Sequence, residues 1–381
     1  MIMSPDGSIR DIELSRYKFV AHLDRLRSLA LGQDVFPVTV ELDLVDFCNH
    51  DCGWCVDPRH MNHALSGTFV ERLLQELVTL GVQGVVFKGG GEPTLHESFS
   101  DVLAYAKSLG YETGVVTNGS RLLDYSRIVV EKADYVRTSI DGPTEESHRR
   151  IHGSDDFGLI LEGVAKVVAY RTERSQRHPI LGLSFAMDYS MIELAGEAVS
   201  LGLRLGVDYV LLRPPFFDEV GRANTMTADQ KGHLFQAFEQ ARKSCAGTME
   251  VLIDYWISDA EAARMAAQED SPRRARSLDF RFNGIEHATR RCRACPLLAV
   301  VAANQRVYPC CNLRFLDEWA VGLLDYDSGQ DFKSIWRSER RKQVMARIHD
   351  VQCIRHCTHP MSRYNEILEY LSSPQYHKGF V

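Results

Sequence analysis

A regular alternation of short apolar runs and longer amphipathic stretches extends from Val38 to about Arg213. The short runs are rich in β-branched residues and have the length of buried strands, whereas the stretches between them carry apolar residues with the period of a helix. Repeated β-α-β units of this kind build a parallel sheet with right-handed crossovers. The rhythm therefore predicts an α/β protein with an open sheet or a partial barrel, whose functional loops lie at the carboxyl ends of its strands.

The segments outside this rhythm suggest further units. Residues 1–37 are predicted to be an N-terminal extension, 38–217 the barrel, 218–288 a mostly helical bridge, and 289–381 a Cys-rich tail domain. The tail has too little apolar sequence to bury a large core alone, so we expect a metal to stabilise it. Expected strands are 38–45, 84–88, 112–117, 135–140, 180–186, 209–213, 298–302 and 306–309; expected helices are 68–80, 98–109, 121–131, 157–173, 192–203 and 332–348.

Composition limits the classes of function. The 381 residues are 45% hydrophobic with a formal net charge of -7, and there is no long Lys/Arg run of the kind that binds nucleic acid or anionic membranes. The N-terminus lacks the apolar segment of a signal peptide, and no uncharged apolar run is long enough to cross a bilayer. We therefore expect a cytoplasmic protein that binds neither nucleic acid nor membrane. In a reducing compartment its 10 cysteines indicate metal binding or redox chemistry rather than disulfides.

Three of these cysteines, Cys48, Cys52 and Cys55, form a CxxxCxxC motif directly after the first predicted strand. Structural zinc sites normally have four protein ligands, whereas a [4Fe–4S] cluster held by three cysteines leaves one iron open to an external molecule. One interpretation is a zinc site completed by His50, His60 or His63. The other is an open iron–sulfur cluster.

A glycine-rich turn follows the second predicted strand and ends in Gly90, Gly91 and Glu92. Glycines allow a close approach of the backbone to a ligand, and a carboxylate can accept charge-assisted hydrogen bonds from an ammonium group. Alone, such a run is also typical of a simple strand-ending turn.

With the cysteine motif, this turn resembles the pattern of the radical S-adenosylmethionine (SAM) superfamily, over about Val38 to Arg213. The resemblance implies a partial (β/α)6 TIM-like barrel. It also implies that Cys48, Cys52 and Cys55 hold a [4Fe–4S] cluster whose open iron binds SAM, and that the Gly90-Gly91-Glu92 turn binds the SAM amino group. Further SAM-binding residues are then expected at Trp54, Asn118, Ser139, Arg150 (or Arg149) and Arg213. Core packing for Trp54, turns for Asn118 and Ser139, and a solvated helix face for Arg149 and Arg150 are the simpler interpretations.

The tail holds a second group of cysteines. Cys292, Cys310, Cys353 and Cys357 resemble the ligands of an auxiliary [4Fe–4S] cluster in a SPASM/twitch domain, although the closing pair is CxxxC rather than CxxC. The neighbours Cys295 and Cys311 leave the choice within each pair open, and a zinc ribbon is the alternative. Cys245, Cys295 and Cys311 would then be spare, and Cys245 is a candidate hydrogen-atom donor to a substrate radical. A buried small hydrophobe is the simpler role for such a cysteine.

The resemblance implies reductive cleavage of SAM to a 5′-deoxyadenosyl radical, which abstracts a hydrogen atom from the substrate. We expect a small polar substrate, such as a sugar, cyclitol or nucleoside of natural-product biosynthesis, that is dehydrogenated or epimerised. A flavodoxin or ferredoxin-type protein is the expected electron donor. About 36 residues precede the first strand, which is short for a leader-peptide-binding domain. The alternatives are a peptide-modifying radical SAM maturase and a non-enzymatic, zinc-stapled binding protein.

Overall fold

The computed structural model describes residues 18–55, 61–215, 226–245, 247, 249–253, 292–348, 365, 367–368 and 371. Cys353, Cys357 and most of the predicted bridge, from residue 254 onward, lie outside these residues. No helix in the described part of the chain is long and apolar enough to span a membrane.

One curved sheet organises the described residues. Its strands follow the order β10-β9-β8-β1-β2-β3-β4-β5-β6-β7. All pairings from β8 to β7 are parallel, whereas β9 and β10 are antiparallel additions at one edge. The strands are β1 (Thr39–Leu42), β2 (Gly84–Phe87), β3 (Glu112–Thr117), β4 (Tyr135–Ser139), β5 (Ile180–Ala186), β6 (Tyr209–Arg213), β7 (Glu250–Ile253), β8 (Leu298–Val301), β9 (Arg306–Tyr308) and β10 (Gly322–Leu323).

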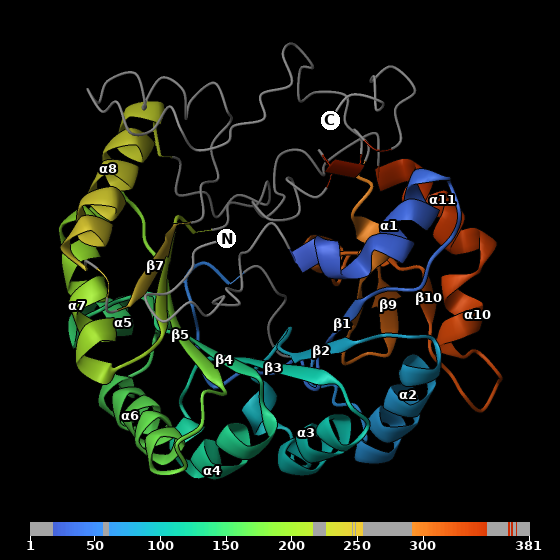
Figure 1. Cartoon of the computed structure of the whole chain (residues 1–381), viewed down its shortest axis with the longest axis horizontal. Coiled ribbons are helices and arrows are strands. Elements are labelled where there is room, and N and C mark those ends of the chain that lie inside the picture. The colour runs from blue at the N-terminus through green and yellow to red at the C-terminus, as the bar shows by residue number, and fades with distance from the viewer. Residues whose placement is uncertain are drawn as a thin grey trace.

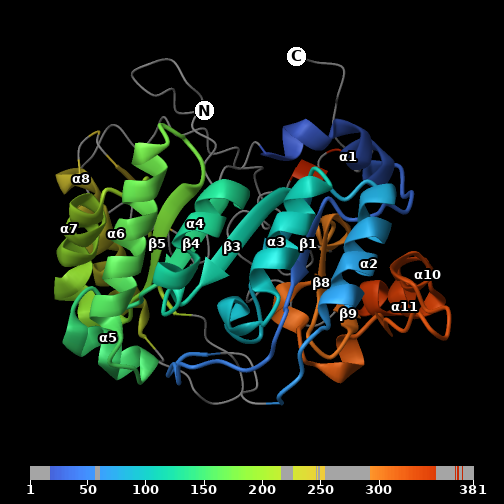
Figure 2. The same ribbon diagram turned by 90° about the horizontal axis from the view of Figure 1, so that it is seen from below.

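The helices cover the outer, convex side of this arc (Figure 1), and a view from below shows α2, α3, α4 and α6 lying over the strands (Figure 2). This arrangement confirms the predicted α/β partial barrel. The helices are α1 (Leu23–Ala30), α2 (Gly67–Thr79), α3 (Phe99–Ser108), α4 (Leu122–Lys132), α5 (Glu145–His152), α6 (Phe157–Glu173), α7 (Ala195–Leu205), α8 (Ala228–Ser244), α10 (Phe332–Trp336) and α11 (Glu339–Ile348).

Side-chain alternation along the strands separates an apolar outer face from a polar inner face. In β1, Val40 and Leu42 are fully buried in the same core as Leu73 and Leu77 of α2. Because successive side chains of a strand point to opposite faces, Glu41 and the following Asp43 face the inside of the barrel. The helix-facing core stabilises the fold, and the concave face is left for polar groups.

Several elements differ from the sequence-based expectation. Strand β7 lies within the segment predicted to be mostly helical, and β8 pairs with β1 so that part of the tail continues the barrel sheet. The expected helix 332–348 is two helices, because the chain breaks after α10 and Ser338 accepts the Arg341 N–H at 3.1 Å to start α11. Helix α5 was not predicted.

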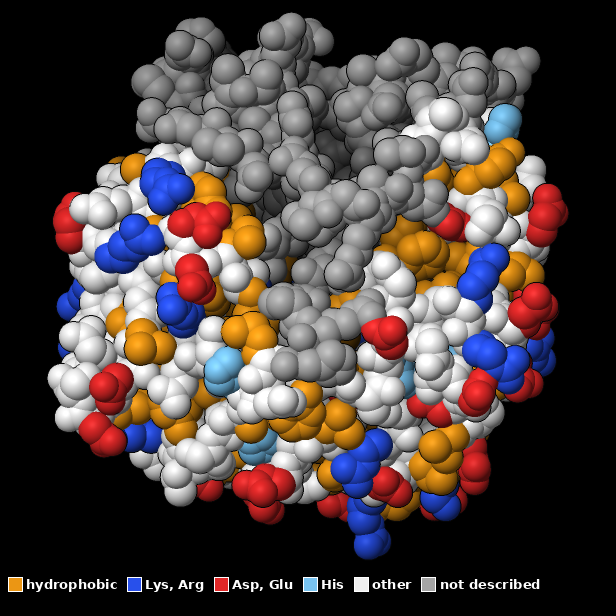
Figure 3. Space-filling model, turned by 180° about the vertical axis from the view of Figure 1, so that it is seen from behind, with side chains coloured by type: hydrophobic (Ala, Val, Ile, Leu, Met, Phe, Trp, Pro, Cys, Tyr) orange, Lys and Arg blue, Asp and Glu red, His pale blue; other side chains and the backbone are white. Residues whose placement is uncertain are grey.

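Surface charge is mixed on the face drawn in Figure 3. Acidic and basic side chains are interspersed there, and hydrophobic side chains lie in small groups between them. On this face no sign of charge dominates, in keeping with the modest net charge of -7.

Candidate active site

The three cysteines of the first motif lie on the loop that leaves the carboxyl end of β1. Backbone hydrogen bonds shape this loop: the Cys55 N–H donates to the Cys52 carbonyl at 3.2 Å, and the His50 N–H lies 3.4 Å from Cys48 Sγ. Burial raises the pKa of the Cys52 thiol, and the nearby Asp141, Cys55 and Cys48 raise it further. All three thiols are carried by one short loop, as a shared metal centre requires.

Helix α5 holds the cysteine loop from the other side. The Asp51 N–H donates to the His152 carbonyl and the Gly53 N–H to the Ile151 carbonyl, both at 2.8 Å. The last turn of the helix can present these carbonyls because α5 ends at Gly153, whose φ of 62° is left-handed. The loop is therefore docked on a helix terminus.

The glycine turn after β2 packs directly against the same loop. A Cβ on Gly91 would lie only 2.1 Å from the Phe47 carbonyl oxygen, and the Glu92 N–H donates to that oxygen at 3.0 Å. Gly91 therefore has to be glycine for the two loops to meet. At Gly90, a Cβ would lie 2.3 Å from the Phe315 ring, which belongs to the tail.

Glu92 is buried and ties three loops together. Its Oε1 accepts hydrogen bonds from the Thr94 N–H at 3.0 Å, from the Thr94 hydroxyl at 2.5 Å and from the Thr117 hydroxyl at 2.6 Å. Its Oε2 accepts the Asn118 N–H at 2.7 Å. The carboxylate expected to contact SAM thus also braces the ends of β2 and β3.

Asn118 extends this bracing to the cysteine loop. Its Nδ2 donates to Asn49 Oδ1 at 2.9 Å and lies 3.7 Å from Cys48 Sγ, and its Oδ1 accepts from the Ser120 N–H at 2.9 Å. The carboxyl ends of β1, β2 and β3 are therefore joined by one hydrogen-bond network around the thiols.

The other residues assigned to SAM lie at different depths. Trp54 is half-buried against the core, and among the described residues its indole N–H has no hydrogen-bond partner. Ser139 ends β4, level with Ser184 of β5. Arg213 ends β6 close enough to Asp141 to help lower the pKa of that carboxyl. Arg150 is exposed on α5, with Nη2 3.5 Å from Ser190 Oγ, and Arg149 forms ion pairs with Glu145 and Asp155.

These residues fit the group that the sequence motif implies. Three thiols on one short loop supply the donor set of a [4Fe–4S] cluster with one open iron. Among the described residues the indole N–H of Trp54, one residue before Cys55, has no hydrogen-bond partner, so it is a donor available to a ligand of that iron. Cys48, Cys52 and Cys55 would hold the cluster, which would supply single electrons at this end of the barrel.

The structure also gathers the described cysteines of the tail. Cys292 and Cys295 are buried with their sulfurs 2.9 Å apart, just before β8. Cys310 and Cys311 follow β9, and hydrogen bonds from the Cys295 and Cys311 thiols hold the pKa of Cys310 well below its ordinary value. Cys295 therefore lies close to both Cys292 and Cys310. Of the expected auxiliary ligands, Cys292 and Cys310 are near one another, and the other two lie outside the described residues.

Cys245 has the surroundings of a core residue. It is 5% exposed, caps the end of α8 and donates its thiol to the Met249 carbonyl at 3.4 Å. It belongs to the main apolar core, among residues of the helix layer. A thiol that donates a hydrogen atom to a substrate would have to face the inside of the barrel. The hydrogen-donor role of Cys245 therefore stays a prediction.

Sequence reasoning missed a buried histidine network next to Cys52. His148 and His152 of α5, stacked with centroids 4.4 Å apart, meet His50 of the loop and the carboxylates of Asp141 and Asp156. The two α5 histidines are four residues apart, the spacing that places side chains on one helix face. That spacing was a signal available in the sequence for the pair. Their contact with His50 joins residues far apart in the chain, so no local pattern could have indicated it.

Comparison with known proteins places this geometry in a family. The family model of the radical SAM superfamily matches residues 42–183. The chain is 28% identical over 167 residues to a probable GTP 3',8-cyclase of Thermococcus kodakarensis, covering 42% of this chain and 54% of that protein. It is 30% identical over 107 residues to an S-adenosylmethionine-dependent nucleotide dehydratase of Selenomonas ruminantium, covering 27% and 38%. The chain thus matches about half, or less, of the length of these relatives.

The fold also resembles that of SuiB from Streptococcus suis. The SuiB complex with S-adenosylmethionine gives a TM-score of 0.58 at 15% identity, covering 86% of this chain and 71% of SuiB. The complex with the precursor peptide SuiA gives 0.61 at 15% identity, covering 91% and 75%. At this identity the likeness concerns the fold. The family match, in contrast, runs from the last residue of β1 into β5 and contains the whole cysteine loop, so residues 42–183 form a domain of the radical SAM superfamily, for which a [4Fe–4S] cluster and SAM are the expected cofactors.

Proposed function

We propose that this protein cleaves SAM reductively and abstracts a hydrogen atom from a small polar substrate held inside the barrel. The observation that carries the proposal is the joining of three strand ends around the thiols, where Gly91 packs on Phe47 and Asn118 reaches Cys48. When bound, the cluster supplies the electron that splits SAM into methionine and a 5′-deoxyadenosyl radical. The chain's own residues hold the cysteine loop, position SAM against it and exclude water.

Polar groups on the concave face support a polar substrate. Ser184 of β5 is fully buried, and among the described residues its hydroxyl has no hydrogen-bond partner. Glu41 of β1 binds Lys88 through Oε1 at 2.9 Å, whereas its Oε2 has no such partner among these residues. Both residues alternate with core residues and so face the barrel interior. A buried polar group normally finds a partner, and a substrate hydroxyl or amine would provide one.

The class of substrate that we propose is a sugar, cyclitol or nucleoside, with dehydrogenation or epimerisation as the outcome. Both curated relatives are named for reactions on nucleotides, which supports the nucleoside within this class. The maturase alternative is supported by the fold of SuiB, which one structure shows with a precursor peptide. We propose a flavodoxin or ferredoxin-type donor for the electron.

The first experiment is anaerobic. The purified full chain is expected to contain about eight irons if both cysteine groups hold [4Fe–4S] clusters. With dithionite and SAM it should form 5′-deoxyadenosine, and Cys48→Ala, Cys52→Ala or Cys55→Ala should abolish this product. Zinc in place of iron, or no SAM cleavage by iron-loaded protein, would overturn the proposal.

The substrate class is tested by stimulation of SAM cleavage. Panels of nucleosides, sugars and aminocyclitols are compared with panels of short peptides, and faster 5′-deoxyadenosine formation identifies the class. Ser184→Ala should weaken stimulation by a small polar substrate while leaving the unstimulated rate in place. Stimulation by peptides alone would favour the maturase.

A further inference from the structure

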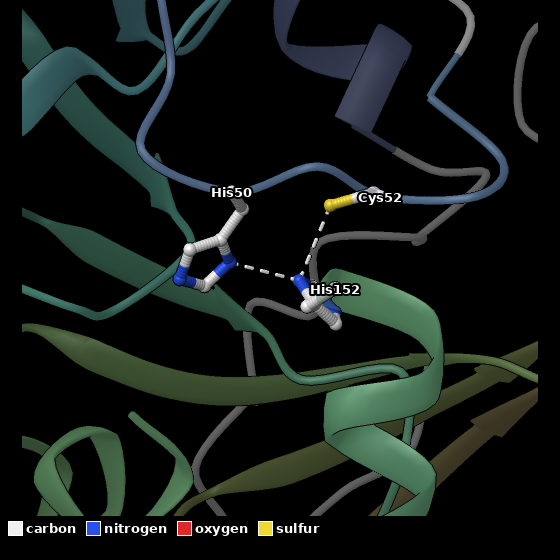
Figure 4. Close-up of side chains that lie close together, drawn as sticks. All are labelled: His50, Cys52 and His152. Atoms are coloured by element: carbon white, nitrogen blue, oxygen red, sulfur yellow. Dashed lines mark hydrogen bonds between the residues drawn. The ribbon is translucent and has the colours of Figure 1, made fainter. Parts of the chain in front are cut away.

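Two histidines and a cysteine converge next to the first cysteine motif (Figure 4). His50 comes from the cysteine loop and His152 from the last turn of α5, and their Nδ1 atoms lie 3.0 Å apart. The same His152 Nδ1 lies 3.3 Å from Cys52 Sγ. The three ligand atoms lie within 4.8 Å of one another, with both histidines buried and Cys52 half-buried. We refer to these three residues as the His50–Cys52–His152 group.

The far nitrogen of each histidine faces a carboxylate. His50 Nε2 lies 2.7 Å from Asp156 Oδ2, and His152 Nε2 lies 3.2 Å from Asp141 Oδ2. Burial alone would raise the pKa of both carboxyls, but their contacts with these histidines and with His148 or Arg213 hold each pKa below its usual value. Both carboxylates are therefore ionised; His50 Nε2 donates a hydrogen bond to Asp156, whereas His152 Nε2 makes no hydrogen bond to a described residue.

A neutral imidazole carries only one N–H, so a histidine that donates through Nε2 presents a lone pair at Nδ1. His50, which donates through Nε2, therefore presents a lone pair at Nδ1, and the Nδ1 of His152 lies 3.0 Å away and can donate to it. A metal ion between these two atoms and Cys52 Sγ would replace that hydrogen bond, with the His152 proton at Nε2 facing Asp141. Carboxylates that fix the far nitrogen of a histidine are also the usual outer partners of metal-binding histidines.

A second cluster, His50, His148 and Asp156, has similar spacing but a different chemistry. There each histidine nitrogen faces a carboxylate oxygen, at 2.7 Å for His50 and 3.2 Å for His148, so ordinary N–H donation satisfies the contacts. No cation is required between these atoms. The His50–Cys52–His152 group, in contrast, brings two imidazole nitrogens and a thiol sulfur together, which are ligand atoms that zinc prefers.

We propose that His50 Nδ1, His152 Nδ1 and Cys52 Sγ form a binding site for one divalent metal ion of the zinc class in the chain that lacks its iron–sulfur cluster. Nitrogen and thiolate ligands at about 2.0–2.3 Å from the ion match the preference of Zn²⁺, and a water completes the tetrahedron. On binding, the Cys52 thiol releases its proton to solvent, and the two imidazoles bind as neutral ligands.

This site and the [4Fe–4S] cluster exclude one another, because both use the Cys52 thiolate. Zinc bound here would therefore block cluster assembly until it is removed. The charges also match: the metal's two positive charges lie among the Cys52 thiolate and the carboxylates of Asp141 and Asp156. The first cysteine loop is then a point where the choice of metal decides whether the enzyme forms.

The test uses the full-length, cluster-free Cys48→Ser/Cys55→Ser variant, which keeps the three ligands but lacks two cluster thiols. It is titrated anaerobically with Co²⁺, whose visible and near-ultraviolet bands report tetrahedral thiolate coordination, and the Co²⁺ is then displaced by Zn²⁺. Because the tail cysteines also bind cobalt, the reference is the Cys48→Ser/Cys52→Ser/Cys55→Ser variant. We expect one Co²⁺ per chain more in the first variant than in the reference.

Substitutions in this background identify the ligands. His50→Gln or His152→Gln should weaken the additional site by more than the about 10–100-fold expected for Asp156→Asn, which removes an outer partner. His148→Gln should leave the affinity within a few fold, and a large loss in that variant would instead assign the metal to the His50, His148 and Asp156 cluster. Circular dichroism of each metal-free variant verifies its fold.

A second measurement does not depend on substitution. X-ray absorption at the zinc edge of the loaded Cys48→Ser/Cys55→Ser variant should show more imidazole scattering than the Cys48→Ser/Cys52→Ser/Cys55→Ser reference loaded in the same way. Equal cobalt binding in the variant and the reference, or zinc without this additional imidazole scattering, would overturn the proposal. Neither assay uses SAM or iron, so its result is independent of the proposed enzymatic activity.

Discussion

The guanidinium of Arg314 meets the carboxylate of Asp43 inside the barrel, with 3.1 Å between Nη1 and Oδ1 and both side chains buried. Asp43 follows β1, and Arg314 belongs to the tail segment after Cys310 and Cys311. The next residue, Phe315, lies against Gly90 of the glycine turn. One short segment of the tail therefore contacts both the first strand and the loop that lies next to the first cysteine motif.

Arg314→Leu should destabilise the protein strongly, because it removes a charged partner from the buried Asp43. Breaking a buried ion pair in this way typically costs about 3–5 kcal/mol in the free energy of unfolding. The matched control is Arg204→Leu, which breaks an exposed pair with Glu197 and should cost less than about 1 kcal/mol. Urea unfolding of the two variants is the measurement, and equal losses would contradict the importance of the buried contact.

Gly91→Ala should prevent the cysteine loop and the glycine turn from meeting, because its Cβ would lie 2.1 Å from the Phe47 carbonyl oxygen. We expect a loss of about four irons per chain and of SAM cleavage. Gly90→Ala meets a side chain instead, the Phe315 ring, so its effect should be relieved by adding Phe315→Leu. Iron analysis and 5′-deoxyadenosine assays distinguish the pair; a fully loaded Gly91→Ala protein would show that the two loops can separate.

Cys310 rather than Cys311 should bind the auxiliary cluster. Hydrogen bonds from Cys295 and Cys311 lower the pKa of Cys310, whereas donation to Cys310 and burial raise the pKa of Cys311. The thiolate is the metal ligand, so Cys310→Ala should reduce the iron content from about eight to about four per chain, and Cys311→Ala should not. The reverse pattern would exchange the two assignments.

Cys245→Ala separates the two roles considered for this thiol. If Cys245 is only a core residue, the substitution should lower the free energy of unfolding by about 1 kcal/mol. Turnover, measured once the substrate is known, should then be unchanged. As a hydrogen donor its loss should stop turnover and leave a substrate radical visible by electron paramagnetic resonance. Cys245→Ser retains the size of the side chain and serves as the packing control.

The strands of the barrel were predictable because local patterns specify them. The runs 112–117, 180–186 and 209–213 coincide with β3, β5 and β6, since β-branched and apolar residues bounded by turns leave little alternative. The pairing of β8 with β1 joins residues more than 250 positions apart, and no local pattern encodes such a contact.

The candidate site was predictable to a similar extent. The cysteine motif and the glycine turn are contiguous in sequence, so their chemistry could be inferred before their geometry. The contact of His50 with His152 could not, because it depends on how α5 docks on the cysteine loop. The closeness of Cys295 to Cys310 likewise follows from the antiparallel pairing of β8 with β9 rather than from spacing in the sequence.

The place of β1 in the sheet also governs how the molecule is made. β1 lies between β2 and β8, and β8 begins only at Leu298. While the ribosome is still synthesising the segment before Leu298, the strand that carries the cysteine loop has one edge without its partner, and such edges favour aggregation. Closing this edge requires a contact of very high sequence separation, which is slow to form. A shortage of chaperones, or loss of the last quarter of the chain, should therefore disrupt the first metal centre although its cysteines lie near the N-terminus.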